Sequence, residues 1–419
     1  MRVSAATWLV VRGEFEVDRK APGERVALWK LDDRFARIDN FLPGNELSIG
    51  PPGVTMSPAP LRRPDPAFLH ALPKTDLHVH LDGSLRPATI LDLARRVDTG
   101  HDFATEDDVL AVCRVADDCQ SLVDYLRVFD VTLKLMQDAP SLTRIAYELA
   151  EDAHSENVRY MEVRYSPLLH CEGGLDFDAV VAAVQAGLDR ARRRYGIRTG
   201  QIICGIRHIA AASSLELADL AVRWKGRGVV GFDLAGAERD FPAKDHLEAF
   251  QRVLKHNINV TVHAGEAFGA PSIHQAVHYC RAHRIGHGTH LVEDPDLMAW
   301  VNDHRIAVEV CLASNLQTKA IPDFRSHPIR RFMEEGLRVT LNTDNRLVSG
   351  TTVTNEYRLA VEHYDLSEDE VLGLVMNGFK AAFLPLQTKV QLIDQVLAEF
   401  ASLGASFSGE ISRRRRIHV

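Results

Sequence analysis

The chain has 419 residues, of which 46% are hydrophobic and 25% are charged, and this balance excludes a disordered chain. The formal net charge of −8 argues against a protein that binds a nucleic-acid backbone, because such a protein needs a basic face. The sequence has no run of about 18 or more apolar residues, so it predicts no membrane-spanning helix.

The six cysteines are scattered and form no Cys-x-x-Cys pair. This spacing indicates a reduced, cytoplasmic protein and not a disulfide scaffold. The apolar stretch near the N-terminus is short and is followed at once by Arg12, Glu14 and Glu16, so it does not resemble a signal peptide.

Residues 1–69 differ from the rest of the chain. Apolar and polar residues alternate over residues 8–17, which predicts a strand, and the proline-rich residues 51–66 predict an extended linker. No residue here suggests chemistry, so we expect an appendage of unknown function that packs on the main domain or on a partner subunit of a homo-oligomer. At the other end, residues 406–419 carry Arg413–Arg416, which we interpret as a solvated basic tail.

Residues 70–405 contain eight short, β-rich apolar runs that are separated by segments of helical periodicity. Strands that alternate with helices predict a parallel sheet, and eight such units predict a closed (β/α)8 TIM-type barrel of the α/β class. The interval after the first run has room for a helical insertion, in which residues 125–136 carry an apolar stripe, and residues 366–403 predict closing helices. The eight runs span 75–80, 158–164, 201–208, 229–235, 257–263, 283–287, 306–311 and 337–343.

Five residues that can bind a metal or transfer a proton lie at or just beyond the ends of these runs, namely His80, His263, Glu266, His287 and Asp344. The C-terminal ends of all barrel strands open onto one face, so we expect these residues to converge there. His78 and His80 lie two residues apart on a strand and therefore point to the same side. With His263 and Asp344 they make a ligand set that suits Zn²⁺ and leaves a position for water, although Fe²⁺, Co²⁺ and Mn²⁺ share these ligand types.

One metal ion per chain is expected, because a binuclear barrel usually needs a bridging lysine at a central strand end. The second, third and fourth runs end in Arg164, His208 and Ala235. We interpret His208, like His283 and His290, as a structural histidine.

Two further residues are candidates for proton transfer. Glu266 lies three residues beyond His263, in a loop whose glycine permits a tight turn, and we predict it to be a proton shuttle and not a ligand. His287 lies between two glycines. Two roles are open for it, since it could orient a metal-activated water or take its proton.

These residues lie in six motifs that follow one another in the order found in adenosine deaminases, and the chain resembles that family over about residues 70–400. Six motifs in order are a specific signal, whereas one would be weak. The motifs are Asp76-Leu-His-Val-His-Leu-Asp-Gly-Ser84, Met161-Glu-Val-Arg-Tyr-Ser-Pro167, Gly231-Phe-Asp-Leu-Ala-Gly236, Val262-His-Ala-Gly-Glu266, Arg284-Ile-Gly-His-Gly288 and Leu341-Asn-Thr-Asp344.

The resemblance implies a zinc-dependent hydrolase of the amidohydrolase superfamily that converts adenosine or 2′-deoxyadenosine to inosine or 2′-deoxyinosine and ammonia in purine salvage. The zinc would be held by His78, His80, His263 and Asp344. Glu266 would protonate N1 of the purine. His287 and Asp344 would together align the attacking hydroxide. The substrate would contact His80, the backbone N–H of Gly236 at N3, and Asp82 at a ribose hydroxyl.

The chain departs from the family pattern after the last strand, where two adjacent aspartates are usual and Asp344-Asn345 is found. The second residue of this pair faces N7 of the purine, which only accepts hydrogen bonds. The Asn345 amide can donate without the shared proton that an aspartate needs. In addition, Asp82 stands where related adenine deaminases typically have glutamate, and this favours a nucleoside.

Several alternatives to adenosine remain open. On the same scaffold the substrate could be adenine, an aminofutalosine-like nucleoside or an adenine nucleotide. A more distant alternative is a catalytically silent relative that acts by binding. The chain lacks the Cys-x-x-Cys signature of cytidine-type zinc deaminases, which excludes their chemistry. We therefore expect a small-molecule purine nucleoside as the partner, and neither nucleic acid nor membrane.

Overall fold

The computed structural model describes residues 15–18, 26–29, 63–116, 119–405 and 407. The chain divides into two units, residues 1–59 and 60–419. In the first unit, β1 (Phe15–Asp18) pairs antiparallel with β2 (Val26–Trp29). Most of the strand predicted over residues 8–17, most of the linker and nearly all of the basic tail lie outside the described residues.

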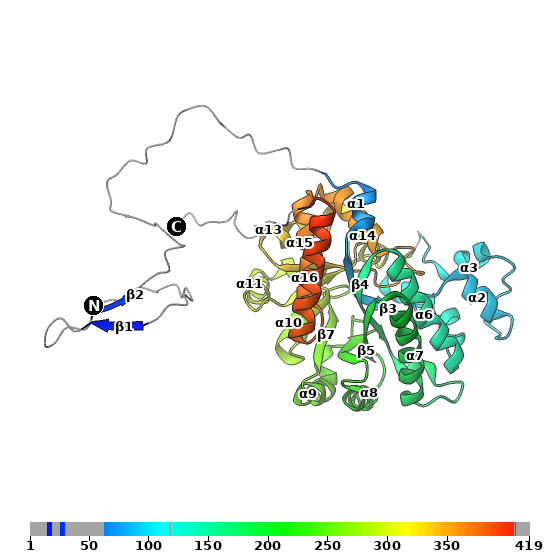
Figure 1. The fold of residues 1–419 in the computed structure, drawn as a ribbon. Coiled ribbons are helices and arrows are strands. Elements are labelled where there is room, and N and C mark those ends of the chain that lie inside the picture. Colours follow the sequence, from blue (N-terminus) through cyan, green and yellow to red (C-terminus); the bar gives the residue numbers. More distant parts are fainter. Residues whose placement is uncertain (1–14, 19–25, 30–62, 117–118, 406, 408–419) are drawn as a thin grey trace. The chain divides into compact units, whose positions relative to one another are not determined.

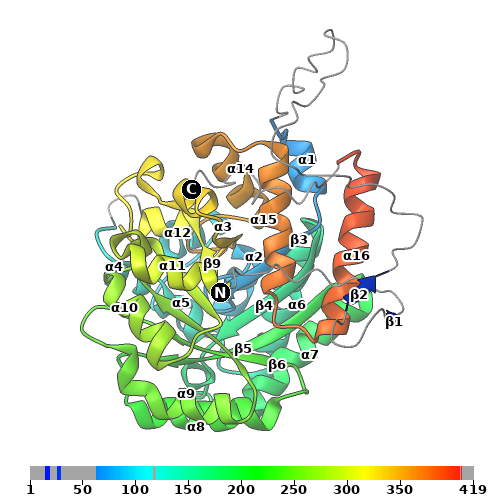
Figure 2. The ribbon, with the colours of Figure 1, turned by 90° about the vertical axis from the view of Figure 1, so that its left-hand side faces the viewer.

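The second unit contains one sheet of eight parallel strands, which follow one another in chain order (Figures 1 and 2). Its two ends meet where the backbone N–H of His80 donates to Asp344 and that of Asp344 donates to His78, both at 2.7 Å. The predicted (β/α)8 barrel is therefore confirmed. The strands are β3 (Lys74–His80), β4 (Val158–Tyr165), β5 (Arg198–Ile206), β6 (Val229–Ala235), β7 (Asn259–Ala264), β8 (Arg284–His287), β9 (Ala307–Val310) and β10 (Arg338–Leu341).

The strands form where apolar, β-branched residues run without alternation, because both faces of a parallel barrel sheet are buried. In β6, for example, Phe232 and Leu234 point to one face of the sheet and Asp233 points to the other, and all three are fully buried. The third predicted strand is too long at its C-terminal end. β5 ends at Ile206, and the following residues leave the sheet toward the cavity described below.

Helices surround the barrel, and most connect one strand to the next (Figure 2). α6 illustrates why they form, since Leu142, Ile145, Ala146 and Leu149 recur at helical spacing and are buried, while Asp138 caps the first turn. The helices outside the insertion are α1 (Pro66–Ala71), α6 (Ala139–Ser155), α7 (Phe177–Tyr195), α8 (Ala211–Trp224), α9 (Leu247–Lys255), α10 (Ala270–His274), α11 (Pro295–Asp303), α12 (Leu312–Gln317), α13 (Ile329–Glu334), α14 (Val353–Tyr364), α15 (Glu368–Ala381) and α16 (Leu386–Ser402). α15 and α16 are the closing helices predicted over residues 366–403.

The helical insertion lies between β3 and β4, as predicted. It consists of α2 (Pro87–Ala94), α3 (Glu106–Cys113), α4 (Leu122–Leu126) and α5 (Phe129–Lys134). The apolar stripe over residues 125–136 is divided between two short helices, because α4 ends at Leu126 and α5 begins at Phe129. Its side chains form part of the roof of the cavity described below.

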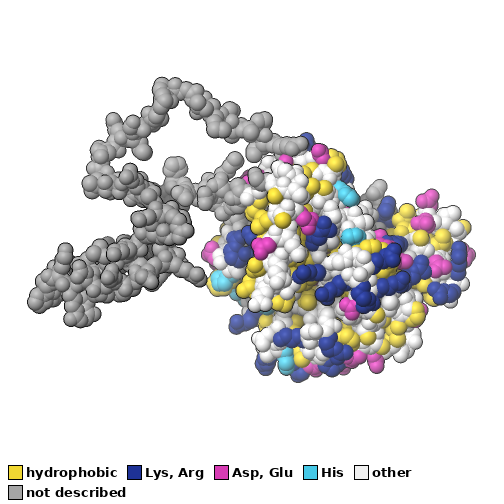
Figure 3. All heavy atoms as spheres, viewed as in Figure 1, with side chains coloured by type: hydrophobic (Ala, Val, Ile, Leu, Met, Phe, Trp, Pro, Cys, Tyr) yellow, Lys and Arg dark blue, Asp and Glu magenta, His cyan; other side chains and the backbone are white. Residues whose placement is uncertain are grey.

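The surface carries both signs of charge. On the face drawn in Figure 3, Lys and Arg side chains are interspersed with acidic and hydrophobic ones. Among the described residues, no helix combines the length and the apolar character that crossing a bilayer requires.

Candidate metal centre and active site

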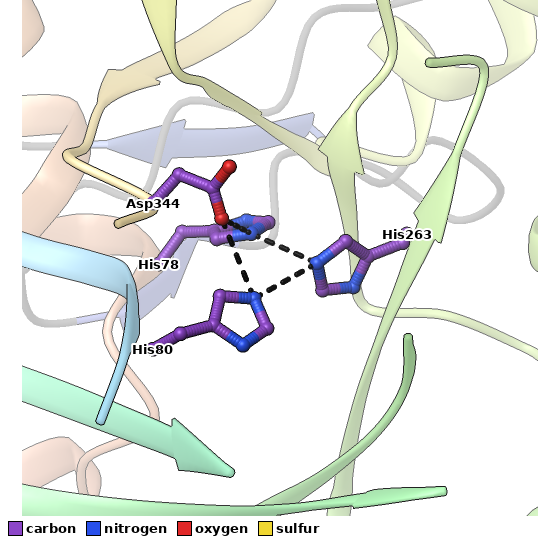
Figure 4. A group of neighbouring side chains, drawn as sticks. All are labelled: His78, His80, His263 and Asp344. Atoms are coloured by element: carbon purple, nitrogen blue, oxygen red, sulfur yellow. Dashed lines mark hydrogen bonds and ion pairs between the residues drawn. The ribbon is translucent and has the colours of Figure 1, made fainter. Parts of the chain in front are cut away.

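Three histidines and one aspartate come together at the C-terminal end of the barrel strands (Figure 4). His78 and His80 lie at the end of β3, His263 lies in β7, and Asp344 follows β10. Nε2 of His263 lies 3.1 Å from Nε2 of both His78 and His80. Oδ1 of Asp344 lies 3.4 Å from the same two nitrogens. The structure thus brings all four predicted ligands together.

The spacing of these atoms fits a shared cation. Imidazole nitrogens without a hydrogen carry lone pairs, and two lone pairs 3.1 Å apart repel each other unless a cation lies between them. Burial lowers the pKa of His263 and lowers that of His80 well below its usual value, so neither of these rings carries a second proton. Burial also acts to lower the pKa of His78, but Asp344 and Glu309 outweigh it there and raise that pKa. Ligand atoms at about 2.0–2.1 Å from a tetrahedral zinc lie roughly 3.3 Å apart. The observed spacings of 3.1 and 3.4 Å match that value.

Two buried carboxylates fix the orientation of the ligand imidazoles. Nδ1 of His78 donates to Glu309 at 2.9 Å, and Nδ1 of His263 lies 3.0 Å from Asp233. Arg164 contacts both carboxylates at 2.9 Å. Burial acts to raise the pKa of Glu309, but charges led by that of Arg164 hold it well below its usual range. His78 and His263 therefore each carry a hydrogen on Nδ1 and direct Nε2 at the cluster.

Asp344 and His287 have a backbone conformation that non-glycine residues rarely adopt. Their φ angles are 59° and 63°, in the left-handed region. Such conformations persist where surrounding contacts determine them, and they concentrate at functional sites. Ser314 donates its hydroxyl hydrogen to Oδ2 of Asp344 at 2.6 Å, which leaves Oδ1 directed at the imidazoles.

Glu266 lies in the tight loop after β7, where the glycine has a φ of 74° as the sequence predicts. The Glu238 carboxylate accepts the backbone N–H groups of residues 265–268 at 2.6 to 3.1 Å, so one buried side chain holds the loop. Burial, followed by the charges of Asp344 and Glu238, raises the pKa of Glu266 well above its usual value. The raised pKa favours the protonated form of the carboxyl, which can donate a proton.

A chain of hydrogen bonds fixes which nitrogen of His287 carries its hydrogen. The backbone N–H of Ile329 donates to Nδ1 of His327, so Nε2 of His327 carries a hydrogen and donates to Oδ1 of Asn315 at 3.3 Å. The Asn315 amide then donates to Nδ1 of His287 at 3.0 Å. Nε2 of His287 therefore carries the hydrogen, and it lies 3.5 Å from Oε2 of Glu266.

The short helix α12 supports three of these groups, because side chains three and four residues apart lie on one face of a helix. Each supporting residue forms a hydrogen bond with one residue of the site. Ser314 bonds to Asp344, Asn315 to His287, and Thr318 to Glu266 at 2.9 Å. α12 directly follows β9, so the strand end sets its position.

A cavity of about 250 Å³ opens above the metal cluster. Its lining includes Glu266, His287 and Asn345, and its roof comes from the insertion through Leu122, Tyr125, Leu126, Phe129 and Leu133. No Lys or Arg is among its lining residues in the part of the chain that the structure describes. Its apolar walls and few polar groups are typical of a small-molecule site.

All four residues predicted to bind substrate line this cavity, namely His80, Asp82, Gly236 and Asn345. Oδ1 of Asp82 is buried without a hydrogen-bond partner among the described residues, and burial raises the pKa of this carboxyl to about 7. Oδ1 of Asn345 has no partner there either. Asn345 packs so closely on Gly83 that a Cβ at residue 83 would collide with it. Gly236 has a φ of 93°, which turns the chain at the end of β6.

The three histidines that we interpret as structural have different positions. Nδ1 of His283 accepts the backbone N–H of Val260, and Nδ1 of His290 donates to the carbonyl of Gly265. His208, however, lines the cavity, because its strand ends two residues earlier than the sequence predicts.

Sequence reasoning missed the residues that support the site. Asp233 and Glu309 gave a signal, since each is a charged residue inside an otherwise apolar strand run. The supporting residues that gave no such signal lie outside the strands, and they are Glu238, Ser314, Asn315, Thr318 and His327.

Comparison with known proteins agrees with this geometry. The family model described as adenosine deaminase matches residues 73–399. An adenosine deaminase of Mycobacterium sp. (strain JLS) is 43% identical over 344 residues, which cover 78% of this chain and 94% of that protein.

Two solved structures share the fold. A zinc-bound amidohydrolase from Burkholderia ambifaria is 27% identical, with a TM-score of 0.74 over 81% of this chain and 93% of that one. An N6-mAMP deaminase from Arabidopsis is 31% identical, with a TM-score of 0.72 over 79% of this chain and 99% of that one. From these matches and the site they cover, the chain belongs to the adenosine deaminase family of metal-dependent hydrolases that act on C–N bonds.

Proposed function

We propose that the chain hydrolyses adenosine and 2′-deoxyadenosine to inosine or 2′-deoxyinosine and ammonia, with one zinc ion per chain. The observation that carries this proposal is the convergence, on one cavity, of a metal-ligand cluster and the buried carboxyl of Glu266. Burial raises the pKa of this carboxyl well above its usual value, which favours its acid form. Hydrolysis at C6 of the purine needs an activated water and a proton for the ring, and the two groups supply these together. In this assignment residues 70–405 form the deaminase, and residues 1–69 and 406–419 take no part in the chemistry.

His78, His80, His263 and Asp344 hold the zinc, which when bound supplies an activated water at the floor of the cavity. Glu266 protonates N1 of the purine, and this makes C6 electrophilic. The hydroxyl of Thr318, which donates to Oε1 of Glu266, keeps the carboxyl turned toward the cavity. General acid catalysis of this kind contributes about 10² to 10⁴-fold.

The hydrogen-bond chain supports one of the two roles that the sequence left open for His287. Because Nε2 carries the hydrogen, the neutral ring donates and cannot also accept a proton at that atom. Burial lowers the pKa of His287 well below its usual value, which keeps the ring neutral. His287 therefore orients the attacking oxygen by hydrogen bonding.

Three residues recognise the nucleoside. The backbone N–H of Gly236 donates to N3, the side chain of Asp82 pairs with a ribose hydroxyl, and the Asn345 amide donates to N7. The unpartnered oxygen of Asp82 supports its role, since a buried acceptor without a partner is costly until a ligand supplies one.

A nucleoside fits the cavity better than a nucleotide. A phosphate dianion in a buried site needs cationic or multiple N–H donors, and the described lining offers no Lys or Arg. Asp82 and Asp130 both line the cavity and would repel a phosphate.

Steady-state rates with zinc-loaded protein test this function. The absorbance change near the purine maximum is followed for adenosine, AMP, N6-methyl-AMP and adenine in parallel. We expect kcat/KM for adenosine to exceed that for AMP by about 10²-fold or more. A preference for either nucleotide would overturn the nucleoside assignment.

A further inference from the structure

The base of the barrel, at the opposite end of the strands from the metal cluster, contains a second cavity of about 200 Å³. It lies where β8, β9 and β10 begin and where α15 is joined to α16. The helices α15 and α16 lie side by side (Figure 2). Five cationic side chains line it: Arg284, which has acidic partners, and Arg305, Arg338, Lys380 and Lys389. No Asp or Glu lines it among the described residues. The proposed deaminase chemistry uses none of these side chains.

The fold dictates this concentration of charge. Arg338 is the first residue of β10, and Arg305 precedes β9 by two residues. Neighbouring parallel strands begin at the same edge, so these guanidinium groups lie close together. Lys380 lies in the last turn of α15 and Lys389 lies in the first turns of α16, on the two sides of the connection between these helices.

These four charges lack compensation. Within the described ranges, none of them forms an ion pair with a carboxylate, and Nε of Arg338 is buried without a hydrogen-bond partner. Arg305 donates to the Gly336 carbonyl at 2.9 Å, and Lys389 donates to the Lys380 carbonyl at 3.0 Å. These neutral acceptors leave the positive charges in place.

Arg284, at the start of β8, gives the contrast within the same cavity. Its guanidinium pairs with the buried Glu162 and Glu309. An arginine at a strand start can therefore be neutralised in this fold, and the other four positive side chains are not.

Two further features indicate a positive potential at this cavity. Burial, followed by the charges of Arg338 and Arg305, lowers the pKa of Lys380, as expected when like charges are crowded. The N-terminus of α16, a helix of 17 residues, lies at the rim and has neither a side-chain cap nor an acidic residue in its first turn. Its free N–H groups favour an anion.

We propose that this basal cavity binds an anion of the phosphate class, either inorganic phosphate or the phosphate group of a monoester. A tetrahedral dianion offers enough acceptors for guanidinium and ammonium groups that approach from several sides. This proposal does not depend on the deaminase substrate, because the two cavities share no lining residue.

Isothermal titration calorimetry tests the proposal on the full chain. Inorganic phosphate and ribose 5-phosphate are titrated separately at constant ionic strength, and sodium chloride serves as the blank. Arg338→Gln removes the guanidinium with the unpartnered nitrogen. Lys380→Gln removes an exposed charge from the same cavity, so it serves if Arg338→Gln fails to fold. The matched control Arg193→Gln removes an exposed charge outside the cavity.

We expect one phosphate per chain, and binding weakened about tenfold or more in each cavity variant but not in the control. Binding of both ligands would identify a site for phosphate monoesters and free phosphate alike, and binding of inorganic phosphate alone would identify a site for the free ion. No binding of either, or equal binding by the wild type and both cavity variants, would overturn the proposal.

Discussion

The two ends of the barrel are made by the same strands but treat buried charge in opposite ways. β8 begins with Arg284 at the base and ends with His287 at the rim, roughly 10 Å away along the strand. β10 begins with Arg338 and leads to Asp344. At the rim every metal-ligand imidazole lies near a carboxylate, whereas at the base four cationic groups have no acidic partner in the described chain.

This difference shows what each end requires from a ligand. At the rim, the Glu309 and Asp233 carboxylates accept hydrogen bonds from imidazole rings, and the Asn315 amide donates one to His287. These bonds fix the rings before any substrate arrives, so substrate binding does not have to order them. At the base, the cationic side chains lack acidic partners until an anion binds and supplies acceptors for them. Changes at the rim should therefore affect catalysis strongly, and changes at the base should not.

The largest effect is expected from His78→Ala, which removes one of the four metal ligands. The remaining three hold zinc weakly, so we expect loss of the metal and a fall in kcat of roughly 10⁴-fold or more. Elemental analysis and adenosine turnover measure the two losses. Retention of stoichiometric zinc with full activity would remove His78 from the ligand set.

The next effect separates metal binding from proton transfer. Glu266→Gln keeps the size of the side chain and removes its acidic proton, so kcat should fall by roughly 10²-fold or more. Zinc content and the affinity for a ground-state analogue should stay near those of the wild type. A variant that loses zinc together with activity would make Glu266 a ligand instead of a proton donor.

Glu238→Gln tests the support of the catalytic loop. The amide offers one acceptor oxygen where the carboxylate accepts four N–H groups, so Glu266 should lose its fixed position. We expect about a tenfold loss of kcat/KM with zinc content unchanged, which is typical when a supporting group is altered. Glu293→Gln, in an exposed side chain of the same region, is the control. Equal losses in the two variants would assign the effect of Glu238 to surface charge.

A smaller effect is expected at Asn345. If its amide donates to N7, a 7-deaza analogue of adenosine should react more slowly than adenosine in the wild type, and Asn345→Ala should narrow that gap. The double comparison should give a coupling energy of about 1 kcal/mol, or about fivefold in kcat/KM. The same discrimination by both proteins would show that Asn345 does not read N7.

The smallest effect is expected from removing the N-terminal section. A chain that starts at Pro64 keeps every residue of the cluster and cavity, so it should bind one zinc and turn over at a rate close to that of the full chain. A shortened chain that folds and binds zinc but fails to turn over would give residues 1–63 a part in the site.

Much of the barrel and of the metal cluster was predictable from the sequence, because strand-end residues of a parallel barrel meet at one face. The positions of His78, His80, His263 and Asp344 follow from that rule. Glu238 and the residues of α12 could not be predicted in the same way. They reach the site from a loop and from a short helix, and nothing in local spacing tells which loop lies beside Glu266. The end of β5 was also misplaced, so His208 was not expected at the cavity.

Titration of metal-free protein with zinc tests the central claim most directly. The metal is removed with a chelator, zinc is returned in steps of a fraction of an equivalent, and adenosine turnover is measured after each step. The cluster of four ligand atoms predicts no turnover without metal, a linear rise up to one equivalent per chain, and a plateau beyond it. Turnover by the metal-free protein, or a rise that continues to two equivalents, would contradict the account.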